Sequence, residues 1–453
     1  MSFANETDAI TYVFQSIASS NWQHRDLDER TRDVTPTQTL LTRLGLPRQS
    51  REYVVITGSK GKGSVSAITA KLLEHLGHKV GLVTSPHLST YRQRFRCNGR
   101  MIAEADLVRL INELVPDIDA VTATLSPGKY LSPQGIFLAM ALKWFDEQNV
   151  TAAVIEVGRG GRFDDNALVP NKLSLFTPII LEHTRYMGNS VERIAWHKAG
   201  IIKPDSTAFS FPQSPEVAAV LSAEAKTQQA RLQFLTPAEM GIYLGPAENG
   251  LRADFGRYGE VVFPLFGQYE IGNAMLAIRA VEDMHSRLQS DLTLAMPEFV
   301  ERIRAGLAHV VWPGRCQKLQ DHPAVYIDGA INTLSAEWFI NSVRDQWTRP
   351  LVTILAVPTD RNYRAVYPLF AQISDALVIT QSTRNITISF PGEEIALPAA
   401  REYHHDVTFR PHVREALEVA IQKAGAGGTV LMAVAQPAVG DTMVVYGLEF
   451  EQI

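Results

Sequence analysis

The sequence predicts an α/β protein made of two domains, each a largely parallel sheet covered by helices. Short apolar runs alternate with stretches of helical spacing, which is typical of parallel sheets. The alternation occurs as two separate series, one from about residue 52 and one after residue 315. A chain of 453 residues, 45% of them hydrophobic, is also longer than one core usually supports. We therefore expect a large domain over residues 1–308 and a smaller, Rossmann-like α/β domain over residues 309–453.

The first series forms the sheet of the large domain. Its first helix, predicted over 64–76, carries Val65, Ile68 and Leu72 on one face, and Gly77 can end it. The N-terminus of this helix therefore points out of the sheet edge at which such folds bind ligands. The predicted strands and one further helix are 53–58 (YVVITG), 79–85 (KVGLVTS), 103–115 (AEADLVRLINELV, the helix), 151–158 (TAAVIEVG) and 172–180 (KLSLFTPII).

The second series forms the sheet of the smaller domain. Before it, residues 205–262 are irregular around a short β-like stretch, GRYGEVVFPL, and we expect insertions near the ligand cleft there. A cleft between two docked α/β domains is the usual place for chemistry. The predicted strands are 324–329 (AVYIDG), 351–357 (LVTILAV), 375–381 (DALVITQ) and 428–435 (GTVLMAVA), with helices over 334–345, 363–373 and 412–424.

Composition and charge exclude several kinds of partner. A net charge of -5 and a pI near 6.2 do not favour nucleic acid or an anionic membrane surface. Neither a leader segment nor a long apolar run is visible. Cys97 and Cys316 have no neighbour at metal-like spacing, so we expect two reduced, buried thiols. These observations predict a cytoplasmic protein.

The stretch TGSKGKGS, which joins the first strand to the first helix, predicts a phosphate-binding loop (P-loop). Its glycines let backbone N–H groups converge on an anion, Lys62 adds a charge, and the helix N-terminus adds a partial positive charge. The spacing departs from the common G-x-x-x-x-G-K-[ST] pattern, because Gly63 lies between Lys62 and Ser64. Alone, it also fits a flexible glycine turn with solvated lysines. The residues expected to contact a nucleotide are Gly58, Ser59, Lys60, Gly61, Lys62, Gly63 and Ser64.

Two further polar residues follow strand-like runs of the large domain. Glu156 ends one run at the sheet edge that binds ligands, and a carboxylate there suits magnesium. Taken alone, Glu156 also fits a solvated strand end. His183 follows the next run, and a lone histidine is more often an ordinary core or surface residue.

The stretch RQRFRCNGR predicts a β-hairpin that turns at Asn98 and Gly99. Its period of two places the arginines on one face of a ribbon, which is either solvated or faces the substrate. Nucleic acid is the competing interpretation, and the acidic chain disfavours it. The arginines concerned are Arg92, Arg94, Arg96 and Arg100.

A series of motifs, taken together, resembles a known family. The motifs are TSPHLSTYRQRFRCNGRMI from 84, VIEVGRGGRFDDN from 154, LEHTRYMGNSVERIAWHKAGIIKP from 181, FGQYEIGNA from 266, WPGRCQ from 312 and IDGAIN from 327. In order and spacing they resemble the folylpolyglutamate synthase and dihydrofolate synthase family of Mur-type ATP-dependent amide ligases. The resemblance runs from about residue 50 to about residue 440.

The resemblance implies a Mur-ligase-like fold and an ADP-forming ligase. Such an enzyme uses ATP and magnesium, in two sites, to phosphorylate a carboxylate, and an amine then attacks the acyl phosphate. The simplest expectation is glutamate addition to a folate. There are two alternatives. One is a related ligase for a non-folate acid, and the other is a nucleotide-binding protein without turnover. The implied partners are a small acid and an amino acid, with no nucleic acid and no membrane.

The resemblance also implies roles for individual residues. Lys198 matches a metal-binding lysine of the family. That lysine is carbamylated, so that it becomes an anionic ligand. Arg315 and Asp328 match residues that reach the ATP phosphates and the nucleotide, and Asn273 matches a position near the adenine. The implied metal set is Ser64, Ser85, Glu156, His183 and Lys198, and the implied catalytic set is Lys62, Glu156, His183, Lys198, Arg315 and Asp328.

Several positions depart from the family pattern. Ser59 stands for a threonine, Lys60 for an asparagine, Gln93 for a glutamate and Arg159 for an aliphatic residue. Three further departures leave the acid substrate open. Glu182 replaces an aspartate, Gly135 lies where a glutamate is common, and Ile331 replaces a histidine. An isoleucine can donate neither a hydrogen bond nor a charge.

Overall fold

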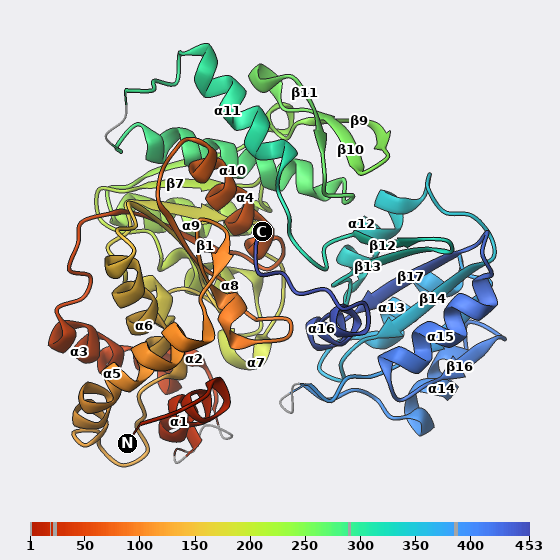
Figure 1. Ribbon diagram of the computed structural model, residues 1–453, viewed down its shortest axis with the longest axis horizontal. Helices are drawn as coiled ribbons and strands as arrows, with labels where there is room; N and C mark the ends of the chain where they lie inside the picture. The colour runs from red at the N-terminus through yellow and green to blue at the C-terminus, as the bar shows by residue number, and fades with distance from the viewer. Residues whose placement is uncertain (1, 19, 21–24, 289–290, 385–387) are drawn as a thin grey trace.

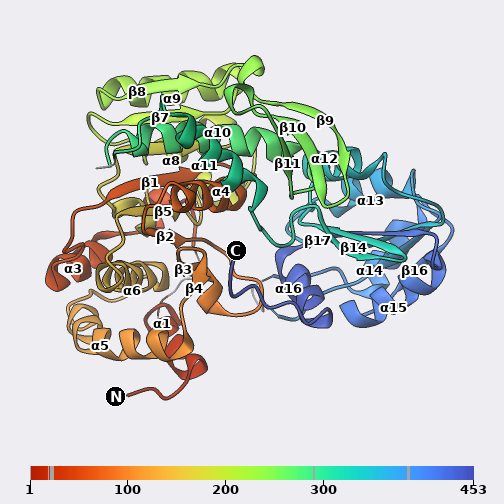
Figure 2. The same cartoon turned by 45° about the horizontal axis from the view of Figure 1, so that its top comes forward.

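The computed structural model describes residues 2–453 except 19, 21–24, 289–290 and 385–387. The chain forms two bodies that lie side by side in both views (Figures 1 and 2). We call the body around the first two sheets the large body and the body around the third sheet the small body. The predicted α/β class is confirmed.

The large body is built on a sheet of eight strands in the order β4-β3-β2-β5-β1-β6-β7-β8. The strands β2, β5, β1, β6, β7 and β8 are parallel, and β3 and β4 form an antiparallel hairpin at one edge. Their carboxyl ends therefore meet along one edge of the sheet. The bounds are β1 Glu52–Thr57, β2 Val80–Val83, β3 Phe95–Cys97, β4 Arg100–Met101, β5 Ala152–Glu156, β6 Leu173–Phe176, β7 Thr207–Ser210 and β8 Arg231–Phe234.

Both faces of this sheet are buried under helices. In β1, Tyr53 and Val55 pack into one core and Val54 and Ile56 into the other, as the two-residue period requires. No helix among the described residues has the length and apolar character needed to span a bilayer. The helices of the first core are α1 Glu6–Ala18, α3 Thr35–Leu44, α5 Glu104–Thr122, α6 Pro133–Glu147, α8 Val191–Ala199 and α9 Pro215–Thr227, with short α2 Asp28–Thr31 and α7 Thr184–Met187 nearby; those of the second are α4 Lys62–His75, α10 Tyr269–His285 and α11 Pro297–Ala308.

The segment expected to be irregular, 205–262, is ordered. It adds β7, α9 and β8 to the large sheet and then forms most of a small antiparallel sheet in the order β11-β10-β9. The strands of this small sheet are half-exposed, so they show no continuous apolar run in the sequence. Its bounds are β9 Ile242–Ala247, β10 Gly250–Asp254 and β11 Glu260–Phe263.

The small body holds a six-stranded sheet in the order β12-β13-β17-β14-β15-β16, parallel except for β12. Helices cover both of its faces, as they do in the large body. The boundary predicted at residue 309 lies in the connection between α11 and β12. The bounds are β12 Gln317–Asp321, β13 Ala324–Asp328, β14 Leu351–Ala356, β15 Ala376–Ile379, β16 Val407–Phe409 and β17 Thr429–Val434, with α12 Thr333–Val343, α13 Tyr363–Ala371, α14 Glu393–Arg401, α15 Val413–Ala424 and α16 Gln436–Val445.

The arginine hairpin differs from the prediction. Asn98 and Gly99 form the expected turn, both with positive φ, at 46° and 69°. The residues before it form a short 3₁₀ helix, Tyr91–Arg94, so Arg92 and Arg94 do not belong to a ribbon face. Arg96 is buried, and its guanidinium donates hydrogen bonds to backbone carbonyls. The prediction of a solvated or substrate-facing arginine ribbon is therefore wrong for this residue.

Two of those carbonyls belong to a tail segment that returns to the large body after α16, and the third is that of Gly99. Arg96 donates to the carbonyls of Phe450 (2.7 Å) and Glu451 (3.1 Å), and Ile453 N donates to Gly99 O at 3.1 Å. The chain thus passes between the two bodies twice, first in residues 309–316 and again in residues 446–453 (Figure 1).

A histidine pair joins β2 to α10 and predicts acid sensitivity. His78 Nε2 lies 2.8 Å from His285 Nδ1, whose own Nε2 lies 2.6 Å from Leu292 O. Burial and the neighbouring His285 lower the pKa of His78 to about 4. Because this folded pKa lies below the unfolded value near 6.5, the unfolded state binds the proton first as the pH falls.

We expect this histidine to remove about 1–2 kcal/mol of stability between pH 6.5 and pH 4.5, allowing for partial exposure. His78→Gln keeps an N–H donor toward His285 but does not titrate. Urea unfolding at both pH values should show a smaller acid loss in the variant than in the unchanged protein. Equal losses would contradict the assignment.

Candidate active site

The loop after β1 has the geometry of an anion site. Gly58 and Gly61 have positive φ of 144° and 86°. A Cβ at Gly58 would lie 1.9 Å from Thr177 Oγ1, and one at Gly61 would lie 2.7 Å from Asn273 Oδ1. Neither position therefore tolerates a side chain. Helix α4 begins directly at Lys62, so its N-terminus and the loop face the same space.

The loop lines a cavity of about 660 Å³ that both bodies share. Ser85, after β2, and Glu156, at the end of β5, line it beside the loop because these parallel strands end at the same sheet edge. Arg315 and Asp328 line it from the small body. Of the predicted residues, the structure brings together in this wall Ser59, Lys60, Gly61, Lys62, Gly63, Ser64, Ser85, Glu156, Asn273, Arg315 and Asp328.

Gly58, His183 and Lys198 do not line the cavity, and Lys198 connects to the loop through Gly58. The Gly58 carbonyl accepts hydrogen bonds from Lys62 Nζ (3.1 Å) and Lys198 Nζ (2.7 Å). Lys198 also pairs with Glu182 at 3.3 Å. Burial lowers the pKa of Lys198 to about 8, although Glu182 opposes this. In this arrangement Lys198 is an unmodified side chain that donates hydrogen bonds, so its role as a carbamylated metal ligand stays a prediction.

Glu182 balances the charge of this cluster. Burial raises its pKa, but the charges of Lys198 and Lys62 outweigh burial and lower the pKa to about 2. The carboxylate is therefore ionised and lies 4.0 Å from His183 Nε2. His183 has positive φ, at 50°. Burial lowers its pKa to about 3, so the ring is neutral, as a metal ligand must be.

Glu156 has a carboxylate oxygen available to a cation, whereas the metal-binding role of His183 stays a prediction. The Ser85 N–H donates to Glu156 Oε2 at 2.9 Å and is the one hydrogen bond to this carboxylate from the described residues, which leaves Oε1 available. Burial raises the pKa of Glu156, and the Lys62 charge opposes this. Among the described residues, no three His, Cys, Asp or Glu side chains form a ready metal cluster. A cation bound at Glu156 would have to keep water and phosphate ligands, as magnesium does.

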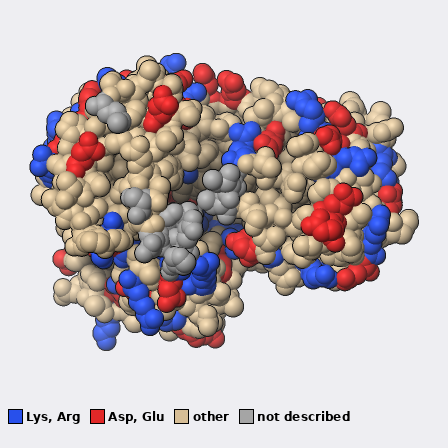
Figure 3. All heavy atoms as spheres, turned by 90° about the horizontal axis from the view of Figure 1, so that it is seen from below, with Lys and Arg blue, Asp and Glu red and all other residues tan. Residues whose placement is uncertain are grey.

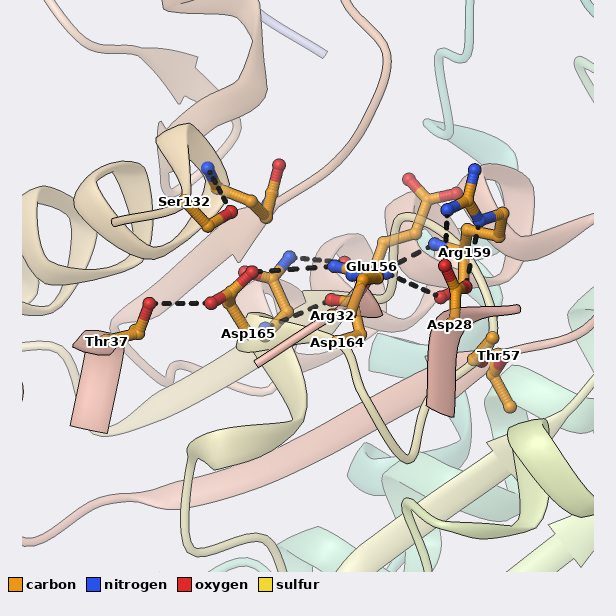
Figure 4. Close-up of polar contacts among 12 residues, drawn as sticks. Asp28, Arg32, Thr37, Thr57, Ser132, Glu156, Arg159, Asp164 and Asp165 are labelled. Carbon is orange, nitrogen blue, oxygen red and sulfur yellow. Dashed lines mark hydrogen bonds and ion pairs between the residues drawn. The ribbon is translucent and has the colours of Figure 1, made fainter. Parts of the chain in front are cut away.

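The segment after Glu156 is held by a buried ionic network (Figure 4). Arg159 binds Asp28 with two hydrogen bonds, at 3.1 and 2.7 Å. Arg32 pairs with Asp164 at 3.4 Å and with Asp165 at 3.5 Å. The network ties residues 28–32, near the N-terminus, to the turn that follows β5. It therefore fixes the position of the Glu156 carboxylate.

The same network explains one departure from the family pattern. Thr37 Oγ1 donates to Asp165 Oδ1 at 2.6 Å and packs on Gly135 of α6. A Cβ at Gly135 would lie 1.9 Å from this Thr37 oxygen, so a glutamate cannot fit there. Ile331 lines the main cavity and packs against the core of the small body.

Sequence reasoning missed three functional candidates. Glu270 is fully buried and accepts hydrogen bonds from Ser64 Oγ (2.7 Å) and Asn273 Nδ2 (2.8 Å). Burial raises the pKa of Glu270 to about 7. Tyr269 OH donates to Asp328 Oδ2 at 2.5 Å and so joins the two bodies. Gln436 accepts from Arg315 at 3.2 Å. The motif FGQYEIGNA contains the first two, but only their partners Ser64 and Asp328, 206 and 59 residues away in sequence, reveal the contacts.

Charges of both signs are interspersed over the face seen in Figure 3. No broad basic field covers that face, which agrees with the composition.

Comparisons with known proteins agree with this geometry. A family model described as "Mur ligase, glutamate ligase domain" matches residues 314–435. The dihydrofolate synthase/folylpolyglutamate synthase of Mycobacterium tuberculosis is 29% identical over 90% of this chain and 85% of its own length. The folylpolyglutamate synthase of Lacticaseibacillus casei is 28% identical over 92% of this chain and 93% of its own length.

Solved structures give the same result. The structure of the M. tuberculosis folylpolyglutamate synthase with ADP superposes with a TM-score of 0.83 at 27% identity, covering 98% of this chain and 99% of the other. The fold, the phosphate-type loop and the matched domain define a Mur-type ligase. Within that class, the chain is similar over most of its length to folylpolyglutamate synthases and dihydrofolate synthases.

Proposed function

We propose that the protein is an ATP-dependent, ADP-forming amide ligase that joins a folate-type acid to glutamate. The observation that carries this proposal is the single cavity in which the P-loop and Glu156 of the large body face Arg315 and Asp328 of the small body. Its relatives are synthases of folylpolyglutamate or dihydrofolate. We further propose that residues 1–308 and 309–453 act as the two domains, and that the unpaired Cys97 and Cys316 fit the cytoplasm.

The reaction has two bond-forming steps. A carboxylate oxygen of the acid attacks the γ-phosphorus of ATP, and the bond from that phosphorus to the β,γ-bridging oxygen breaks, which releases ADP. The amine nitrogen then attacks the acyl carbon, the bond from that carbon to the phosphate oxygen breaks, and the nitrogen loses a proton. The loop amides, Lys62 and Arg315 bind and orient the phosphates, and Asn273 lies beside the loop where the nucleotide enters.

Magnesium would be held by Glu156 and His183, with Ser85 and Ser64 beside it, and would neutralise phosphate charge. Lys198 and Glu182 keep the Gly58 carbonyl and His183 in place behind the loop. Asp328, held by Tyr269 and the Cys316 N–H, fixes the small body against this site.

A second cavity supports a place for the acid. It holds about 300 Å³ and is lined by Arg25, Arg32, Arg94, Phe14 and Phe137, beside Gly158 of the loop after Glu156. Arg94 donates to His87 Nδ1 at 3.0 Å and lies over the rings of Tyr91 and Phe137, but it has no carboxylate partner among the described residues. A guanidinium that lacks a carboxylate partner and lies next to aromatic rings can bind the carboxylate and the ring of an aromatic acid.

The acyl phosphate can be tested with labelled oxygen. The protein is incubated with ATP, magnesium, glutamate and pteroates or folates whose reacting carboxylate carries ¹⁸O. Each amide formed should place one ¹⁸O in the released phosphate. Amide without labelled phosphate would overturn the acyl phosphate. Phosphate release with other acids only would replace folate by another substrate, and ATP binding without any release would show that the protein is not a ligase.

A further inference from the structure

One cation in the wall of the main cavity takes no part in the hydrogen bonds and ion pairs of the site. It is Lys60, which lies in the P-loop two residues before Lys62 and is half-buried. Its side chain has no hydrogen-bond or ion-pair partner among the described residues. The other cations of the site do have partners.

Those partners are specific. Lys62 and Lys198 donate to the Gly58 carbonyl, and Lys198 also pairs with Glu182. Arg315 donates to Gly314 O at 3.0 Å and to Gln436 Oε1 at 3.2 Å. The ammonium of Lys60 is therefore the one lysine charge of the described loop that is not engaged by protein atoms.

Burial is the largest influence on the charge of Lys60, and neighbouring charges of both signs follow. Burial lowers the pKa of Lys60 to about 8. Glu182 attracts the ammonium from beyond ion-pair distance, whereas Arg361, Lys62 and Arg315 repel it. Arg361 approaches from the small body, and its Nε is buried without a hydrogen-bond partner among the described residues. Among the described residues, Arg361 forms one ion pair, with its neighbour Asp360 at 3.8 Å.

A partly buried charge without a counter-ion is costly and persists where it serves a ligand. The chemistry that this position requires is an anion with several oxygens, because cations approach it from the loop and from the small body. The transferring phosphoryl group is such an anion, with charge spread over three oxygens in the transition state.

We propose that Lys60 is a second catalytic lysine of the loop, whose ammonium binds the oxygens of the γ-phosphoryl group while that group passes from ADP to the acid. The inference rests on the proposed function for the identity of the reaction. Lys62 holds the phosphates of bound ATP, whereas Lys60 contributes most when the bond to ADP is breaking. Its loss therefore lowers kcat and leaves the affinity for ADP nearly unchanged.

The test compares Lys60→Met and Lys60→Arg with a matched control, Lys129→Met. Lys129 is exposed, pairs with Asp33 and does not line the cavity. We expect Lys60→Met to lower kcat for acid-dependent phosphate release about 10²-fold, with the KM for ATP changed less than about threefold. Lys60→Arg should retain most of the rate, and Lys129→Met should retain all of it.

A binding measurement separates this inference from the proposed function. Aluminium fluoride with ADP and magnesium imitates the transferring phosphoryl group and needs no acid. The unchanged protein should bind ADP more tightly when aluminium fluoride is present, and Lys60→Met should lose most of that gain while it keeps its affinity for ADP alone. If no acid supports turnover, the proposed function fails, but this measurement still decides the role of Lys60. An unchanged kcat in Lys60→Met, or an equal loss of ADP affinity with and without aluminium fluoride, would overturn the inference.

Discussion

Lys62→Ala should lower acid-dependent ATP turnover by about 10³-fold or more, the largest effect that we expect from any single substitution. Lys62 is the first residue of α4, so its ammonium and the helix N-terminus act on the same anion. Alanine keeps the helix and the glycines but removes this charge. The loss should appear in kcat/KM for ATP, measured as phosphate release with a folate acceptor.

The fold should survive this substitution. The substitution removes the hydrogen bond from Lys62 Nζ to Gly58 O and the attraction of Lys62 for Glu156 and Glu182, but no packing in a core, so the midpoint of thermal unfolding should shift by no more than about 3 °C. Lys129→Ala serves as the matched control, since it also removes one lysine charge. A turnover rate equal to that of the unchanged protein would remove the phosphate role of Lys62.

Glu156→Gln should lower turnover by a similar factor, about 10³-fold, while it leaves the protein equally or more stable. Glutamine keeps the shape of the side chain and an oxygen that accepts from the Ser85 N–H, but it removes the charge. Burial raises the pKa of Glu156, which means that the carboxylate is costly to keep ionised there. A buried carboxylate that is kept although its ionisation is unfavourable is expected to bind a cation.

The measurement is a magnesium titration of ATP turnover. The magnesium concentration at half-maximal rate should rise at least about tenfold in Glu156→Gln. Glu147→Gln, on the outer surface of α6, provides the control. A Glu156→Gln protein with normal magnesium dependence would exclude this carboxylate from the metal site.

Much of the fold could be predicted because its parallel strands are buried on both faces. The run YVVITG and its counterparts read as continuous apolar segments, and the glycine-rich stretch marks the start of α4. The β9 to β11 sheet has one exposed face, and β8 is a short edge strand, so neither stands out from its surroundings. Periodicity also misled at the arginine hairpin, where the chain turns into a 3₁₀ helix and Arg96 is enclosed by a tail more than 350 residues away in sequence.

The candidate site was predictable in its components but not in its contacts. Glu156, His183 and the loop could be placed at one sheet edge from strand order alone. The bond from Glu270 to Ser64 and the pairing of Lys198 with Glu182 depend on side chains from separate elements. The sequence also does not show that the ammonium of Lys60 has no hydrogen-bond or ion-pair partner among the described residues.

The two passages of the chain between the bodies limit how the enzyme can open. Two rigid parts that are connected at two separate points can rotate about the axis through those points without stretching either connection. In such a motion each atom travels in proportion to its distance from the axis. Arg315 belongs to the first passage and lies near the axis, so a rotation of this kind would move it less than the outer rim of the small body.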